Sequence, residues 1–361
     1  MAATSPSCAR VQSVHSQALN LLRFPLAIVI VTIHIFNVTP ADAGEVSYPI
    51  FDFAKTFIRS FLHWQSVPIY FFISGFVFFI GLRTWDKGKW LKKLQNRKKS
   101  LFIPYLVWNT LFLFLVLYSA DNLNFDIKSL LSCYWRYDGV MTGVASTDMP
   151  INVPLWFLRD LMLMVLISPV LYRMLKKQGK LLLVFFGVMW LVKYFGDFKI
   201  YMPAQALLFF SFGAYMSING KDMIAEFGRY KKLSVIGYFA LGILAMCFHS
   251  APVVYKIIKS MLIVVGLFFA FNTAVWLLKK GYCKSNEFLA SSSFFIYVAH
   301  SLVYSNVATI LNRLCPPESD ISWLLSCLIN VVLTTLILLS AYYLMLRYTP
   351  RLMGVMTGRK G

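Results

Sequence analysis

Long apolar runs recur along this chain and are separated by short stretches rich in charged residues. The runs are close to the length of about 17–25 residues that a tilted helix needs to cross the hydrocarbon layer of a membrane. They cover residues 18–38, 66–82, 101–118, 155–172, 181–195, 201–218, 233–249, 256–278, 288–311 and 321–346. The pattern therefore predicts an all-α polytopic membrane protein with about ten transmembrane helices.

The runs follow one another without a large polar insertion, so we expect a single membrane domain over residues 18–346. A polar N-terminal tail (1–17) precedes it, and a basic tail (347–361) follows it. The first apolar run lacks the short core and the small-residue cleavage site of a secretory signal, so no cleavable signal peptide is expected. No internal repeat is evident in the sequence, although inverted repeats are frequent in transporters.

Composition and charge agree with a membrane protein. The 361 residues are 58% hydrophobic and 14% charged, whereas soluble domains carry about 25% charged residues. The net charge of +20 could indicate nucleic-acid binding, but the Lys and Arg residues gather in alternate loops between the runs, as the positive-inside rule describes. These loops are 83–100, 173–180, 221–232 and 279–284. We therefore expect both termini in the cytoplasm, contacts with anionic lipid headgroups and no binding of nucleic acid.

The first apolar run contains two polar side chains of special interest, Arg23 and His34. An arginine inside a membrane span is costly, so it usually faces the protein interior or a water-filled path. Their spacing puts both on one helix face, about 16 Å apart along the axis. Arg23 would then lie near the cytoplasmic surface and His34 deeper, which suits binding of an anionic donor and proton or acyl transfer farther in. In the alternative interpretation, Arg23 reaches the headgroups and Pro25 marks the first turn of the helix.

Two further runs carry polar residues that could line a site. Ser74 and Gly75 allow a close approach of helices, and packing is the favoured role for them. Trp156, Arg159 and Asp160 begin the fourth run, at the outer membrane boundary. Because adjacent residues on a helix do not face each other, we expect Arg159 and Asp160 to have separate partners. Trp156 shares a helix face with Asp160, and its alternative role is that of an interfacial anchor.

The ninth run contributes Tyr297 and His300, which share a helix face because they are three residues apart. His300 falls near the middle of the membrane, where it is either a second functional imidazole or a structural hydrogen-bonding group. The histidines lie on separate runs without carboxylate or cysteine neighbours, so no metal site is expected. Cys133 and Cys315 fall in outer loops and could form a disulfide, although free thiols are the favoured interpretation.

Two polar segments have patterns of their own. The outer loop 119–154 contains Tyr134, Trp135 and Tyr137, whose rings suit stacking on sugars but also occur at membrane interfaces. The inner loop 83–100 mixes tryptophans with lysines, which is typical of a basic amphipathic helix lying on the membrane surface.

The Arg23/His34 pair resembles the hallmark of the acyltransferase 3 family of integral membrane proteins. Four further stretches are similar to that family's patterns and occur in the same order: VPIYFFISGF (67–76), LWFL (155–158), FGAY (212–215) and FIYVAH (295–300). The resemblance covers roughly residues 15–345. It implies an enzyme that transfers an acyl group, usually acetyl from acetyl-CoA, to sugars of cell-surface or exported glycans.

The resemblance also implies roles for individual residues. His34 would be the catalytic residue, either deprotonating a sugar hydroxyl or taking the acetyl group and relaying it, and Arg23 would bind the CoA end of the donor. The residues that would line the site are Ser74, Gly75, Trp156, Arg159, Tyr297 and His300.

The expected location is the bacterial inner membrane, with acyl-CoA, a glycan acceptor and membrane lipids as partners. The alternative function is a transporter or flippase for a glycan or a lipid-linked intermediate, with the polar residues lining a pathway. The asymmetric Arg23/His34 pair, in a sequence without evident inverted repeats, favours the enzyme.

Overall fold

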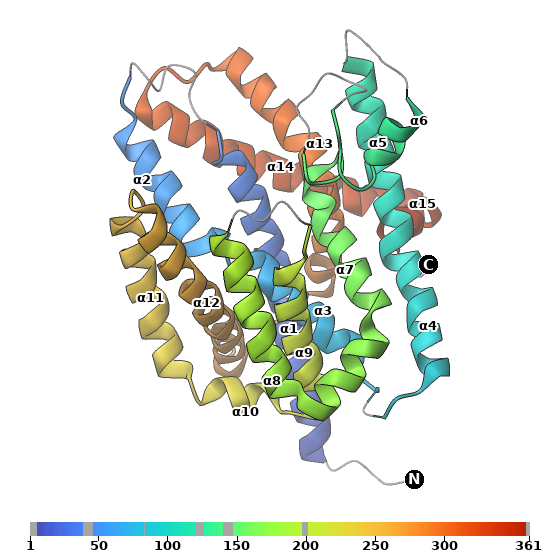
Figure 1. Ribbon diagram of the computed structural model, residues 1–361. Coiled ribbons are helices and arrows are strands. Elements are labelled where there is room, and N and C mark those ends of the chain that lie inside the picture. The colour runs from blue at the N-terminus through green and yellow to red at the C-terminus, as the bar shows by residue number, and fades with distance from the viewer. Residues whose placement is uncertain are drawn as a thin grey trace.

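The computed structural model describes residues 6–38, 46–82, 84–119, 126–139, 147–196 and 201–358, and these form a bundle of helices (Figure 1). Within those ranges there is no β-strand. Among the described residues, seven helical segments are long and apolar enough to cross a membrane: Val14–Ile35, Pro49–Phe79, Lys87–Tyr118, Ser168–Phe195, Pro252–Lys280, Glu287–Leu314 and Asp320–Tyr348. The all-α polytopic fold predicted from the apolar runs is therefore confirmed.

The remaining predicted spans form shorter helices, namely α7 (Trp156–Leu166), α9 (Ala204–Ile218) and α11 (Lys231–Cys247). Each apolar run of the sequence thus corresponds to helical structure, but seven segments rather than ten reach the length for crossing on their own. The shorter helices pack against longer neighbours, α9 against α8 (Ser168–Phe195) and α11 against α12 (Pro252–Lys280).

Two helix boundaries differ from those expected. Helix α1 (Pro6–Ile35) begins well inside the predicted N-terminal tail and carries Pro25 in its interior, so Pro25 does not mark a first turn. Gln178 in α8 has φ −139° and ψ 42°, which are not helical values. The loop expected over 173–180 is therefore reduced to a kink between two helical stretches.

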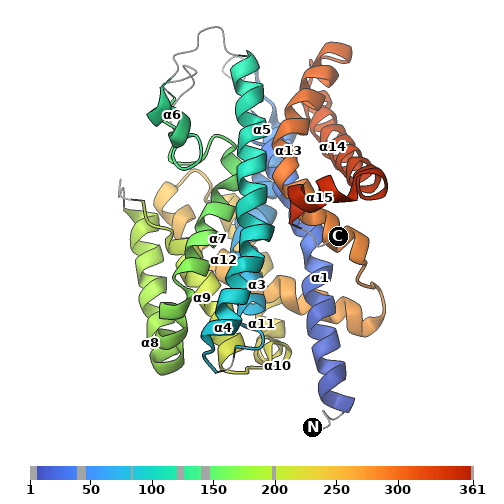
Figure 2. The same ribbon diagram turned by 90° about the vertical axis from the view of Figure 1, so that its right-hand side faces the viewer.

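Two long rods are each built from two helices joined by a π-helical turn. One rod consists of α2 (Pro49–Ile58), η1 (Arg59–His63) and α3 (Ser66–Phe79). The other consists of α4 (Lys87–Arg97), η2 (Lys98–Phe102) and α5 (Ile103–Ser119), and Figure 2 shows it as one continuous element. Helix α4 is thus helical as predicted, but it continues into the following span instead of forming a separate surface helix.

The other helices complete the bundle and its connections. They are α6 (Ile127–Ser132), η3 (Val153–Leu155), α10 (Met223–Gly228), α13 (Glu287–Leu314), α14 (Asp320–Tyr348) and α15 (Pro350–Thr357). The predicted C-terminal tail therefore contains a helix, α15, which packs against α5 and α14 (Figure 2). The indole N–H of Trp108 in α5 donates to the backbone carbonyl of Met356 at 2.9 Å and holds α15 in position.

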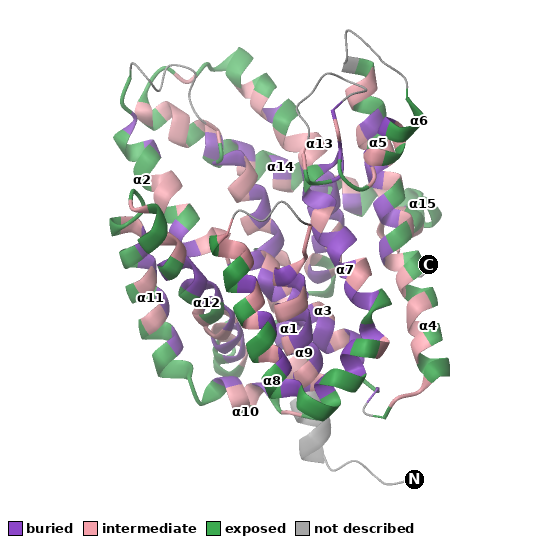
Figure 3. Ribbon diagram, in the orientation of Figure 1, coloured by how far each residue is buried: buried purple, intermediate pink, exposed green. Residues whose placement is uncertain are grey.

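Helix α1 lies at the centre of the bundle, where it contacts α3, α12, α13, α14 and η1. Figure 3 shows the buried residues gathered on the central helices, while the outer helices turn many exposed residues outward. Many of those exposed residues are large and apolar, such as Val184 of α8 and Leu336 of α14, as lipid-facing positions require. The face of α1 that carries the polar residues is therefore surrounded by protein.

The most extensive contact between two helices joins α3 and α9. A Cβ atom added at Gly75 of α3 would overlap the backbone carbonyl of Phe210 in α9, and one added at Gly213 of α9 would overlap the carbonyl of Phe72 in α3. Each helix thus presents a glycine to the backbone of the other, which is the close approach that small residues permit in membranes. Gly75 lies at this crossing and lines none of the cavities described below.

We expect Gly75→Ala to destabilise the protein by about 1–3 kcal/mol, because overpacking at a site bounded by backbone cannot be relieved by a side-chain rotation. The matched control is Gly187→Ala in α8, where an added Cβ meets nothing within 4 Å. The midpoint of thermal unfolding in detergent measures both effects. Equal midpoints for the two variants would contradict the tight crossing.

Candidate functional site

An inner cavity of about 360 Å³ lies between α1, α3, α7 and α13. Arg23, Tyr70, Ser74, Arg97 and Tyr297 line it, so it gathers three of the residues singled out from the sequence. None of the described residues that line it is a carboxylate. Two guanidinium groups without a lining acid make this cavity attractive to an anion.

Arg23 is held in place through its backbone. The Tyr70 hydroxyl of α3 donates to the backbone carbonyl of Arg23 at 2.6 Å and joins the two helices there. No carboxylate in the described part of the chain forms an ion pair with the Arg23 side chain. Its guanidinium is therefore available to a ligand in the inner cavity.

A larger, basic cavity of about 1150 Å³ adjoins the inner one, since both are lined by Val77, Arg97 and Ser100. The α4–α5 rod and α15 form its walls. Its charged lining residues are all basic: Lys93, Arg97, Lys99 and Arg351. These residues belong to the loop and tail that the charge distribution assigns to the cytoplasmic side.

His34 of α1 and His300 of α13 form a pair, with ring centroids 5.0 Å apart. The Tyr304 ring lies 6.2 Å from each of them. His300 is fully buried, and its Nδ1 lies 2.6 Å from the backbone carbonyl of Tyr297, so Nδ1 carries a proton. Its Nε2 then bears a lone pair and has no hydrogen-bond partner among the described residues. The pair thus offers an unoccupied basic nitrogen next to a second imidazole.

The histidine pair lies just beyond the inner cavity. Ile30 and Tyr297 line that cavity, and His34 and His300 follow them by about one helical turn on the same faces of α1 and α13. The described residues bring no three His, Cys, Asp or Glu side chains together in a metal-binding group. The arrangement suits proton transfer by imidazole at the end of an anion-binding cavity.

An outer cavity of about 400 Å³ lies on the other side of Val67, which lines both it and the inner cavity. It is assembled from η1, α3, α7, α8, α9 and α12. Its aromatic and charged lining residues are His63, Trp64, Trp156, Asp160, Trp190, Lys193, Tyr194 and Lys259. Trp156, singled out from the sequence, therefore lines a cavity different from the one that holds Arg23.

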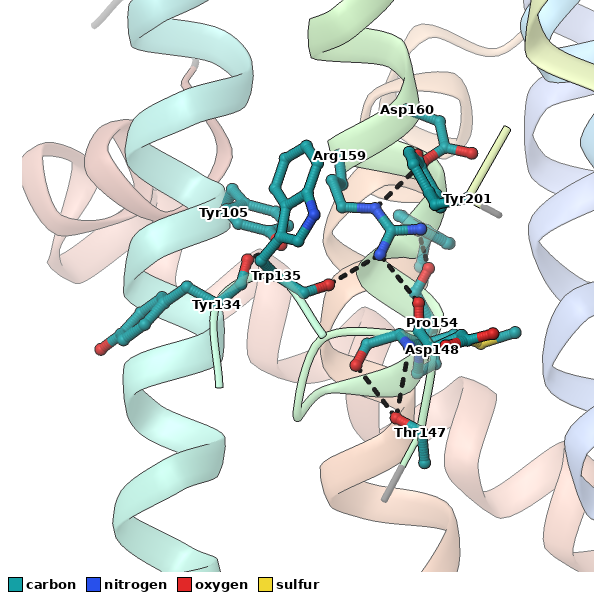
Figure 4. Close-up of polar contacts among 11 residues, drawn as sticks. Tyr105, Tyr134, Trp135, Thr147, Asp148, Pro154, Arg159, Asp160 and Tyr201 are labelled. Carbon is teal, nitrogen blue, oxygen red and sulfur yellow. Dashed lines mark hydrogen bonds and ion pairs between the residues drawn. The ribbon is translucent and has the colours of Figure 1, made fainter. Parts of the chain in front are cut away.

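Arg159 is 3% exposed and joins the outer loop to the helix bundle (Figure 4). Its guanidinium donates to the backbone carbonyls of Trp135 at 2.7 Å and Asp148 at 3.0 Å. Its Nε also donates to Asp160 at 3.1 Å, so the prediction of separate partners is wrong: the side chain is long enough to fold back onto its neighbour. Burial raises the pKa of the Tyr201 hydroxyl, which stays protonated and donates to the same carboxylate.

The described part of the outer loop packs against the end of α5. Tyr137 is buried in a small core with Cys133, so its ring is not available for stacking on a sugar, whereas Trp135 remains 42% exposed. Cys133 and Cys315 are both free thiols, and burial raises the pKa of the Cys133 thiol to about 11. The stretches 120–125 and 140–146 of the predicted loop lie outside the described residues.

An imidazole pair at the end of an anion-attracting cavity, with His300 buried and His34 half-buried, fits a membrane-embedded transferase. The chain matches the acyltransferase domain of the acyltransferase 3 family over residues 16–346, nearly its whole length. It belongs to this family and is a multi-pass membrane protein, so the resemblance seen in the sequence is confirmed.

The chain is also similar to a curated protein of polysaccharide biosynthesis, the succinoglycan biosynthesis protein ExoH of Rhizobium meliloti (strain 1021). The two are 26% identical over 243 residues, which cover 63% of this chain and 60% of the relative. No solved structure matches the chain.

Proposed function

We propose that this acyltransferase transfers an acetyl group from cytoplasmic acetyl-CoA to a hydroxyl group of an exported or cell-surface polysaccharide, in the bacterial inner membrane. One observation carries the proposal: the inner cavity adjoins both the basic cavity and the outer cavity, and the histidine pair lies beside it. The relative's part in succinoglycan biosynthesis supports a polysaccharide acceptor.

The basic cavity and the inner cavity together fit a CoA thioester. CoA carries several phosphate charges at one end, and the basic cavity would hold them with Lys93, Lys99 and Arg351. Arg97 lines both cavities and Arg23 lines the inner one, so positive charge continues inward. The uncharged pantetheine arm would then extend along the inner cavity and bring the thioester close to His34.

The chemistry then needs one proton acceptor. Neutral His34 takes the proton of the sugar hydroxyl as the oxygen attacks the thioester carbon. The C–O bond forms, the C–S bond breaks, and the proton passes to the CoA thiolate. The lone pair on His300 Nε2 can accept a hydrogen bond during this transfer and so orient the pair. Because the inner and outer cavities adjoin, both substrates can be bound together, which favours direct transfer over an acyl-histidine relay.

The outer cavity suits a saccharide. Trp156 and Trp190 offer aromatic faces, and Asp160 offers a carboxylate that can accept hydrogen bonds from sugar hydroxyls. Trp156 would thus act on the acceptor, whereas Ser74 and Tyr297 would contact the donor. Arg159 would act indirectly, by holding Asp160 in position.

The proposal is tested with sealed membrane vesicles of both orientations. Inverted vesicles expose the cytoplasmic face, so added acetyl-CoA should release free CoA thiol, and mass spectrometry should detect acetylated glycan. Right-side-out vesicles given the same acetyl-CoA should release none.

Vesicles from cells that lack the gene serve as the control for other thioesterases. The proposal fails if neither orientation releases thiol in a gene-dependent way. If the glycan then disappears from the cell surface of the deletion strain without any change in acetylation, the transporter alternative is favoured.

A further inference from the structure

The outer cavity contains a buried cation that neither the fold nor the donor explains. Lys259 of α12 is 8% exposed and lines this cavity. No carboxylate among the described residues lies within ion-pair distance of its Nζ. The ammonium instead sits over the Trp64 ring and 5.0 Å from the centroid of the Tyr194 ring. A buried ammonium that lies against aromatic rings without a carboxylate partner loses hydration that a charge partner would replace.

The other charges around Lys259 are mostly of the same sign. Arg59 and Lys256 are close enough for their charges to act on it. Asp160 is the one carboxylate among the described lining residues, and Arg159 and Tyr201 already bind it. Lys259 therefore lies among basic neighbours, and the carboxylate in the same cavity is already bound.

The position of Lys259 cannot be ascribed to membrane topology. The cavity is formed by the ends of α7, α8, α9 and α12 that the charge distribution assigns to the outer side. The positive-inside rule predicts few basic residues there. A cation that is both buried and on the outer side requires another reason, and an anionic ligand in the cavity would supply it.

We propose that the outer cavity binds an acidic saccharide, and that Lys259 pairs with a sugar carboxylate of the acceptor. This inference rests on the proposed function, because it takes the outer cavity as the acceptor site. The aromatic rings beside Lys259 contact the sugar face, so the carboxylate and the ring are bound together. Binding a carboxylate replaces the hydration that burial removes from the ammonium, whereas a neutral sugar leaves the charge unpaired.

The matched probes are methyl β-D-glucuronide and methyl β-D-glucoside. They differ only at C6, which is a carboxylate in the glucuronide and a hydroxymethyl group in the glucoside. Binding to the purified full-length protein in detergent is followed by saturation-transfer NMR and by quenching of tryptophan fluorescence. We expect the wild type to bind the glucuronide at least 10-fold more tightly than the glucoside, a difference of about 1.4 kcal/mol. Lys259→Gln should bring the two affinities within twofold of each other, and Lys259→Arg should keep most of the preference.

Lys256→Gln is the control, because it removes a nearby charge that does not line the outer cavity and should keep the glucuronide preference. The inference is overturned if the wild type does not prefer the glucuronide, or if Lys259→Gln retains the preference. The wild-type comparison stands even if Lys259→Gln fails to fold. If acetyl-CoA releases thiol but the glucuronide is not preferred, the inference alone is refuted. If no thiol is released, the proposed function is refuted.

Discussion

Replacing His34 by alanine should lower acyl transfer by about 100- to 10,000-fold, the range that a general base contributes. His34 faces His300 at the end of the inner cavity, and alanine there removes the imidazole that would take the hydroxyl proton. The fold should survive, because His34 is only half-buried and lies on α1, outside the tight α3–α9 crossing. The measurements are CoA release in inverted vesicles and acetylation of the glycan.

His249→Ala provides the matched control, since that imidazole is exposed beyond the end of α11 and bonds only to nearby groups. Its activity should equal that of the wild type. Near wild-type acetylation by a His34→Ala protein of unchanged thermal stability would exclude a catalytic role for His34.

Arg23→Ala is expected to raise the Michaelis constant for acetyl-CoA by about 10- to 100-fold, since hydrogen bonds to charged groups contribute about 1.5–3 kcal/mol. Arg23 lines the inner cavity on the path from the basic cavity, where the anionic end of the donor would pass. Arg23→Lys should recover part of the loss, because the charge remains but the planar fork of donors does not. Steady-state kinetics at varied acetyl-CoA measures the effect.

Arg229→Ala is the control for a general loss of positive charge. Arg229 is exposed, pairs with Glu226 at 3.1 Å and lines none of the cavities described here. A loss of acceptor affinity in Arg23→Ala, with an unchanged constant for the donor, would remove Arg23 from the donor site.

The helical spans and the polar face of α1 were predictable because they depend on local patterns. Hydrophobicity over a window identifies spans, and helical periodicity puts Arg23 and His34 on one face. The pairing of His34 with His300 was not predictable, because it depends on which helices pack together and at what height. Tyr304 was missed for the same reason: a tyrosine in an apolar run has no distinctive local signal.

Lys259 shows a further limit of local patterns. It is the fourth residue of the run 256–278, after Lys256, and lysines near a span end normally reach the headgroups. Only the structure brings it against Trp64 and Tyr194 from two other segments. The signal that could have indicated it is its position at the outer end of a span, where lysine is unusual.

The junction of the inner and outer cavities has a consequence for the membrane potential of the cell. Cavities that adjoin from one face of a membrane protein to the other could allow ions to leak and dissipate the membrane potential. The residue shared at the junction is the apolar Val67, and hydrophobic constrictions oppose the passage of water and ions. An acetyl group is small and uncharged, so it can cross a boundary that ions cannot. The same side chain would thus let the enzyme move a chemical group outward while keeping the membrane electrically sealed.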